Sequence, residues 1–171
     1  MTVTLAVLNA MTRDGFVAVC GPFYEHSPWI AERTWERKPF AGRDALHAAL
    51  VATLQDSSRA EQVGLIVAHP DLVGRLAREG RLTQASTTEQ RAAGLDRLSE
   101  AEIGAFDRYN AQYREKFGFP FVICARENKK DAILAAFPVR LKHTPDEEIG
   151  AALVEIGKIG RLRLNDAITE A

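Results

Sequence analysis

Helix-start signals recur along this sequence and constrain its fold more strongly than any other feature. A Ser or Thr is followed three residues later by Glu at Ser58, Ser86, Ser99 and Thr144, which is the capping-box pattern that satisfies free backbone N–H groups at a helix start. The strict alternation of apolar and polar residues that indicates a strand is nearly absent. No internal repeat or linker divides the chain. We therefore expect an all-α fold, a single-domain helical bundle over residues 1–171.

The expected helices end where proline or glycine interrupts the pattern. Pro70 disfavours the helical conformation at the residue before it, and Gly80 and Gly94 end two further segments. The expected helices cover residues 27–35, 43–55, 58–69, 71–78, 86–94, 99–117, 131–137 and 144–167.

One apolar run does not fit a helix. At about residues 118–124 it reads Gly-Phe-Pro-Phe-Val-Ile-Cys, and Pro120 inside the run removes a backbone donor and clashes with the preceding turn of a helix. We expect one buried extended segment here, packed between helices. Such a segment leaves several backbone N–H groups in need of partners.

The charge balance argues against large anionic partners. A formal net charge of −1 gives none of the long-range positive potential that binders of nucleic acid or anionic membranes use. No apolar run approaches the length of about 20 residues that spans a bilayer. No secretory signal begins the chain, and Thr169-Glu170-Ala171 is no peroxisomal address. We expect a cytoplasmic protein with a small-molecule substrate, no nucleic acid and no membrane.

The histidines and cysteines do not predict a metal site. The four histidines are scattered, and Cys20 and Cys124 lie far apart in apolar runs, as buried free thiols do. His69 is the most informative of the four histidines, because Pro70 turns its backbone out of the helix and directs the imidazole off the helix end. It is either a working side chain or a structural histidine at a helix C-terminus.

Two further side chains have both a structural and a chemical interpretation. Glu89 completes a capping box with Ser86, yet a helix start with Ser86, Glu89 and Gln90 is also suited to a polar or anionic ligand. Arg163 lies about 20° around its helix from Ile156, on the apolar face, so it needs a carboxylate partner. That partner is either a structural acid or a substrate carboxylate, whereas Arg161 falls on the solvent side.

These residues lie within motifs that resemble the 2-oxo-4-hydroxy-4-carboxy-5-ureidoimidazoline (OHCU) decarboxylase family. The run Phe-Gly-Phe-Pro-Phe together with Ala-His-Pro-Asp-Leu is the most specific part of the resemblance. The matching segments are 25–29, 68–72, 86–95, 110–121 and 158–164.

The resemblance implies a cofactor-free, all-helical enzyme, usually a homodimer, that converts OHCU to (S)-allantoin in urate degradation. By match to the family's motifs, His69 and Glu89 are the catalytic pair. The resemblance also implies a substrate pocket lined by Pro70, Ser86, Gln90, Phe121, Val122, Ile123 and Arg163.

The chemistry agrees with these residue types. An imine beside the breaking bond can accept the electrons, so no cofactor such as pyridoxal phosphate is needed as electron sink. An arginine holds the carboxylate, amide N–H groups bind the ring or ureido oxygen, and the acid–base pair delivers a proton to one face. Two alternatives remain: a catalytically inactive helical binding or regulatory module, and a hydrolase of a related ureido compound.

Overall fold

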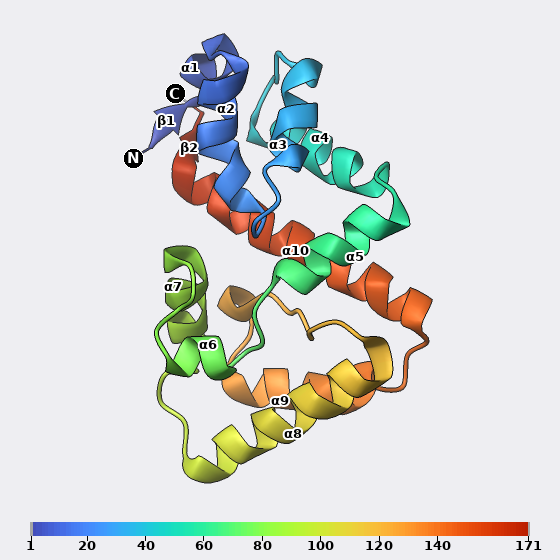
Figure 1. Cartoon of the computed structure of the whole chain (residues 1–171). Coiled ribbons are helices and arrows are strands. Elements are labelled where there is room, and N and C mark those ends of the chain that lie inside the picture. The colour runs from blue at the N-terminus through green and yellow to red at the C-terminus, as the bar shows by residue number, and fades with distance from the viewer. Residues whose placement is uncertain (1, 171) are drawn as a thin grey trace. The chain divides into compact units, whose positions relative to one another are not determined.

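A computed structural model describes residues 2–170, and nearly all of their regular structure is helical (Figure 1). The elements in chain order are β1 (Val3–Thr4), α1 (Leu5–Ala10), α2 (Arg13–Cys20), the 3-10 helix η1 (Gly21–Phe23), α3 (Trp29–Thr34), η2 (Trp35–Arg37), α4 (Arg43–Gln55), α5 (Arg59–Ala68), α6 (Arg75–Arg78), α7 (Gln84–Ala92), α8 (Glu100–Phe117), η3 (Ala125–Glu127), α9 (Lys130–Arg140), α10 (Pro145–Ala167) and β2 (Ile168–Thr169). The predicted all-α class is confirmed.

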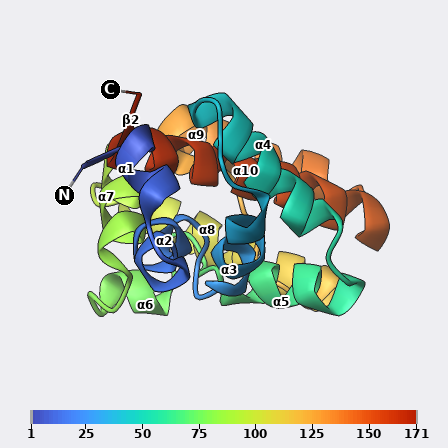
Figure 2. The ribbon, with the colours of Figure 1, turned by 90° about the horizontal axis from the view of Figure 1, so that it is seen from above.

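The two strands form a minimal parallel sheet. Val3 pairs with Ile168 and Thr4 with Thr169, which brings the two ends of the described chain side by side (Figures 1 and 2). Within the described residues, no helix has the length and apolar character needed to cross a membrane.

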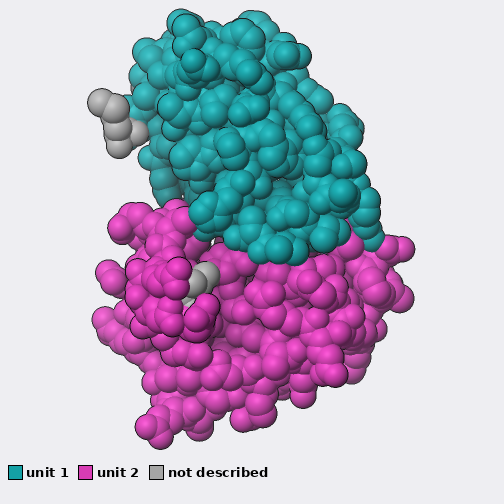
Figure 3. All heavy atoms as spheres, in the orientation of Figure 1, with its two compact units in different colours: residues 1–68, 157–171 teal, residues 69–156 magenta. Residues whose placement is uncertain are grey.

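The chain divides into two compact units, coloured separately in Figure 3. Unit 1 comprises Met1–Ala68 and Gly157–Ala171, and unit 2 comprises His69–Ile156. The long helix α10 contributes its first part to unit 2 and the remainder to unit 1. The single domain expected over residues 1–171 stays a prediction.

The core of unit 1 is built from apolar helix faces. On α4 the predicted stripe of Leu46, Leu50 and Leu54 is buried, and α4 packs on α3, which packs on α2. The bounds of α4 agree with the expected residues 43–55 because glycine precedes the helix and its leucines repeat at helical spacing.

The core of unit 2 is aromatic. Phe106 and Tyr113 of α8 and Phe137 of α9 are fully buried, and the rings of Phe106 and Phe137 meet edge to face with centroids 6.1 Å apart, a favourable geometry for aromatic pairs. The segment at 119–124 contains no helix or strand and is mostly buried, which confirms the predicted extended segment.

Three of the predicted helix starts are confirmed by their capping hydrogen bonds. At Ser58 and at Thr144 the backbone N–H donates to the Glu three residues on, and that Glu's N–H donates back to the hydroxyl. Ser99 makes the same reciprocal pair at the start of α8. In each case the two partners are close in sequence, so the pattern identifies them directly.

Several helix boundaries were predicted wrongly, among them the start expected at residue 27, since α3 begins at Trp29. The helix expected from residue 71 begins at Arg75, because residues 71–74 form a turn in which the Gly74 N–H donates to the Asp71 carbonyl at 3.3 Å. Helix α7 begins at Gln84 rather than at residue 86. Helix α9 continues past Phe137 to Arg140, since Pro138 lies in its last turn and removes only one internal hydrogen bond.

Candidate active site

His69 follows the last residue of α5 and is buried, with 7% of its surface exposed. As predicted, the chain leaves the helix at this residue, because Pro70 follows it. The imidazole thus belongs to an irregular segment, residues 69–74, in which Val73 adopts a left-handed conformation with φ 57°. A β-branched residue in this region is strained, so other contacts must hold the segment in place.

Helix α8 supplies two of these contacts. The Nδ2 atom of Asn110 donates to the Leu72 carbonyl at 2.9 Å, and both carboxylate oxygens of Asp71 accept from Nε of Arg114 at 3.0 Å. Asn110 is a polar residue, yet it is buried on the otherwise apolar stripe of α8. Its role is to fix the backbone that follows His69.

Helix α7 carries the other predicted polar residues of unit 2. Its N-cap is Thr83, whose hydroxyl accepts from the Ser86 N–H. The predicted capping box at Ser86 and Glu89 is therefore wrong, because both residues lie inside the helix. Helix capping no longer accounts for Glu89, which lies one helical turn after Ser86.

Gln90 joins α7 to the irregular segment. Its side chain is buried, and its Oε1 atom accepts from the Val73 N–H at 3.1 Å. Gln90 also lines a cavity of about 430 Å³ in unit 2. Neither His69 nor Glu89 lines this cavity.

The extended segment at 119–124 is held by aromatic stacking. The ring of Phe121 stacks on Phe137 with centroids 3.9 Å apart and meets Tyr113 edge-on at 5.4 Å. The segment leads directly into η3, which packs against α7. The segment after His69 thus bonds to α7 through Gln90, and α7 packs against η3, into which the extended segment leads.

The backbone of the extended segment is anchored at two points. The Val122 carbonyl accepts from Nη1 of Arg140 at 2.5 Å, and the Cys124 N–H donates to Oε2 of Glu155 at 2.8 Å. Across residues 2–170, no acceptor takes a hydrogen bond from the N–H groups of residues 121–123. Phe121 and Val122 are buried and Ile123 is partly exposed. Backbone N–H groups away from water normally have a partner, so these groups are suited to bind a ligand oxygen.

Arg163 belongs to unit 1 and is buried, whereas Arg161 is one-third exposed and pairs with Asp44. Helical phase therefore predicted both positions correctly. Nη1 of Arg163 lies 3.0 Å from Oε2 of Glu25 and 3.3 Å from the Pro22 carbonyl. In this structure Glu25 is thus a carboxylate partner of Arg163.

The cysteines are buried and form no disulfide. Burial raises the pKa of the Cys20 thiol to about 12 and raises that of Cys124 as well. Neither is a thiolate at neutral pH, so neither has the character of an activated nucleophile. Within residues 2–170, no group of three or more His, Cys, Asp or Glu side chains is placed to hold a metal ion.

Comparison with known proteins identifies the family. The model of the OHCU decarboxylase family matches residues 9–165. The chain belongs to the OHCU decarboxylase family.

Individual relatives agree with this assignment. The 2-oxo-4-hydroxy-4-carboxy-5-ureidoimidazoline decarboxylase of Haloferax volcanii is 43% identical over 94% of both chains. That of Halalkalicoccus jeotgali is 40% identical over 95% of this chain and 90% of the relative. A crystal structure of (S)-allantoin synthase superimposes with a TM-score of 0.78 at 30% identity, covering 97% of this chain and 54% of that chain.

Sequence reasoning did not find the residues that hold the predicted OHCU decarboxylase site. Arg140, Glu155 and Thr83 all bond to its segments. Arg140 and Glu155 stand 18 and 31 positions from their partners, so no local pattern links them. Thr83 had a detectable signal, because it precedes Ser86 by the usual capping distance.

Proposed function

We propose that this chain, an OHCU decarboxylase, works without a cofactor and uses His69 and Glu89 as its acid–base pair. The family match over residues 9–165 carries the reaction itself, decarboxylation of OHCU to allantoin in urate degradation. The chain is thus a carboxy-lyase. Relatives named as decarboxylases give no support to the alternatives of an inactive binding module or a hydrolase.

The proposed step separates CO2 from a ring carbon and leaves the bonding electrons on that carbon. The adjacent imine of the substrate delocalises them, so the protein must orient the substrate, donate hydrogen bonds and move one proton. His69 is buried at a helix end and Glu89 lies inside α7. We assign to this pair the delivery of a proton to one face, which yields the (S) product.

The remaining proposed residues bind the polar groups of the substrate. Arg163 binds the carboxylate before it leaves, since guanidinium and carboxylate match bidentately. Ser86, Gln90 and Pro70 line the pocket, and the N–H groups of residues Phe121, Val122 and Ile123 bind the ring or ureido oxygen. The buried position of Arg163 supports its place in this set.

We further propose that the protein is a cytoplasmic homodimer that acts on a small molecule and binds neither nucleic acid nor membrane. The near-neutral net charge of −1 supports the part of this proposal that concerns nucleic acid and membranes. Sedimentation at micromolar concentration tests the dimer; a monomer with full activity would contradict it.

The decisive experiment oxidises urate enzymatically in the presence of the purified chain and follows allantoin by circular dichroism. We expect faster formation of one enantiomer, whereas spontaneous decay gives racemate. His69→Asn should reduce turnover by about a hundredfold or more, the usual scale for a positioned acid or base. Near-normal turnover of folded His69→Asn protein would assign His69 to a structural role.

Glu89→Gln gives a clean test of the second member of the pair. Gln has the size of Glu and can also form hydrogen bonds, so the substitution should leave the melting temperature nearly unchanged. Gln cannot exchange a proton at neutral pH, so activity should be lost. Full activity in this variant would remove Glu89 from the mechanism.

Arg163→Lys and Arg161→Lys form a matched pair on α10. Lys keeps the charge of Arg163 but loses the planar fork, so kcat/KM should fall by roughly ten- to a hundredfold, the scale of one charge-assisted hydrogen bond. Arg161→Lys should be almost silent. Impaired activity of Arg161→Lys together with normal activity of Arg163→Lys would contradict this proposal, because it would mean that the substrate binds on the face of α10 that carries Arg161.

A further inference from the structure

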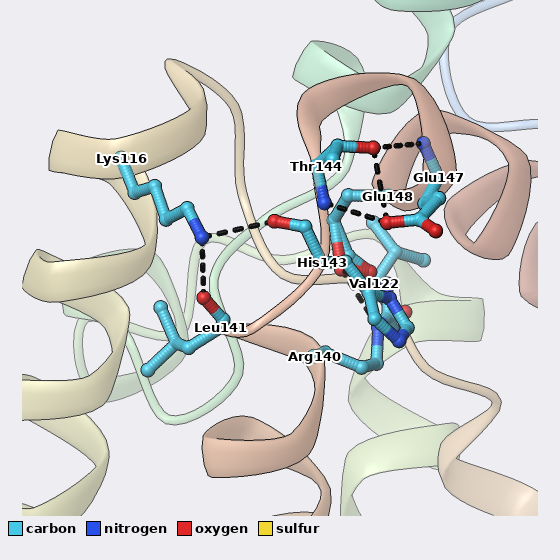
Figure 4. Close-up of polar contacts among 8 residues, drawn as sticks. All are labelled: Lys116, Val122, Arg140, Leu141, His143, Thr144, Glu147 and Glu148. Carbon is cyan, nitrogen blue, oxygen red and sulfur yellow. Dashed lines mark hydrogen bonds and ion pairs between the residues drawn. The ribbon is translucent and has the colours of Figure 1, made fainter.

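A buried ion pair joins the end of α9 to the start of α10 within unit 2 (Figure 4). Nε of Arg140 donates to both carboxylate oxygens of Glu148, at 2.5 and 3.3 Å. The two side chains are 9% and 0% exposed. Glu148 stands in the first turn of α10, where free N–H groups and the helix dipole favour a negative charge.

The turn between these helices is held from both sides. Nζ of Lys116 on α8 donates to the carbonyls of Leu141 and His143, at 2.5 and 2.9 Å. Thr144 opens α10 with a capping box (Figure 4). The ion pair is therefore set beside a turn that hydrogen bonds hold to α8 and to the start of α10.

Arg140 makes a third contact, which reaches the extended segment. Its Nη1 atom donates to the Val122 carbonyl at 2.5 Å, and its guanidinium carbon lies 4.4 Å from the centroid of the Phe121 ring. Glu148 orients the guanidinium, and the guanidinium orients the Val122–Ile123 peptide. We call Arg140, Glu148 and the Val122 carbonyl the peptide latch.

Stability alone does not explain a buried pair of this kind. The free energy lost by removing two charges from water offsets most of their attraction. Replacing both partners by hydrophobic residues therefore often leaves protein stability unchanged or increases it. A hydrogen-bonded ion pair fixes the orientation of its side chains, which apolar packing alone does not do. In the peptide latch, the oriented guanidinium in turn fixes the orientation of one backbone carbonyl.

Fixing this carbonyl also fixes a donor. The Val122–Ile123 peptide is trans, and in a planar trans peptide the carbonyl and the following N–H point in opposite directions. The Ile123 N–H therefore points away from Arg140. The next N–H, that of Cys124, is already bound by Glu155 at 2.8 Å, which anchors the other side of Ile123.

We infer that Arg140 and Glu148 are positioning residues of the decarboxylase: through the Val122 carbonyl they hold the Ile123 N–H in the orientation that binds the ring carbonyl oxygen of the substrate, onto which the negative charge accepted by the neighbouring imine nitrogen is delocalised. This inference rests on the proposed function. Preorganised donors act mainly on the transition state, so the peptide latch should influence kcat more than KM.

Two variants separate positioning from folding. Arg140→Lys keeps a charge but cannot bond Glu148 and Val122 with one planar group. The double variant Arg140→Met/Glu148→Leu removes both charges and should melt near the wild-type temperature. Both should lose about 10- to 100-fold in kcat, the range for a misplaced or missing donor, with KM changed by less than about threefold. Arg37→Lys, in an exposed pair with Asp56, serves as control and should keep wild-type kinetics.

Hydrogen–deuterium exchange provides a readout independent of activity. In Arg140→Lys, a peptide covering residues 119–124 should exchange faster than in the wild type, while peptides from unit 1 stay unchanged. Wild-type kcat in either folded variant, or a loss explained by the unfolded fraction alone, would overturn the inference. If the wild type does not accelerate allantoin formation, the proposed function has failed, and unchanged exchange at 119–124 would separately refute the peptide latch. If the double variant does not fold, Arg140→Lys alone decides.

Discussion

Alanine at Gly160 should reveal how closely Tyr24 packs on α10. A Cβ atom at this position would lie 3.0 Å from Cζ and 3.1 Å from the hydroxyl oxygen of Tyr24. The Tyr24 ring is rigid and only 1% exposed, so it cannot move aside freely. Gly150 stands in the same helix, where an added Cβ atom would meet no heavy atom within 4 Å, so Gly150→Ala is the matched control.

The expected magnitudes follow from two opposing terms. Replacing a helix-interior glycine by alanine stabilises by about 1 kcal/mol, and that term acts alone in Gly150→Ala. Overpacking a buried contact costs about 1–3 kcal/mol. Gly160→Ala should therefore range from neutral to about 2 kcal/mol less stable than the wild type. At about 2–4 °C per kcal/mol for a chain of this size, Gly150→Ala should melt about 2–4 °C higher.

Thermal unfolding followed by circular dichroism measures both variants under identical conditions. Gly160→Ala should melt at the wild-type temperature or as much as about 8 °C below it. Because Tyr24 precedes Glu25, the partner of Arg163, we also expect lower kcat/KM in Gly160→Ala alone. A melting temperature for Gly160→Ala equal to or above that of Gly150→Ala would refute the close contact on which this reasoning depends.

Three further predictions follow from the caps and the buried thiols. Cys20 and Cys124 should react slowly with a thiol reagent in the native protein and fully in guanidinium, because burial raises the pKa of both thiols. The pKa of Glu61 is lowered from 4.5 to about 2, chiefly by the Arg33 hydrogen bond, so its contribution to stability is present above pH 4.5 and is lost as pH falls toward 2. Urea titrations should show a smaller loss over this range in Glu61→Gln. Thr83→Ala should lower the unfolding free energy by about 1 kcal/mol, the usual value of an N-cap, and an unchanged value would mean that Thr83 does not cap α7.

The sequence by itself determined features that depend on neighbours within a few positions. The capping boxes at Ser58, Ser99 and Thr144 join residues three apart, and the apolar stripe of α4 repeats within one helix. Pro120 excludes a helix by its own covalent structure. The contrast between Arg163 and Arg161 also follows from one helix, since phase alone places them on different faces.

The sequence proposed the residue types of the candidate site but not the contacts that hold them. The motifs around His69 and Glu89 carried the resemblance to the family, yet the role of Glu89 in a capping box was wrong, since Thr83 competes for the same helix start. Two serine or threonine residues near one helix start both fit the pattern. Only the folded backbone decides which hydroxyl meets a free N–H group.

Tertiary structure alone decided which distant groups meet. Nothing near Arg163 in the sequence identifies Glu25 as its partner, 138 positions away, and nothing near Val122 identifies Arg140. A buried charge requires a partner of opposite sign or a hydrogen-bonding group. The sequence predicts that such a partner exists but does not identify it. The packing of separate helices determines its identity, because packing decides which side chains share a buried space.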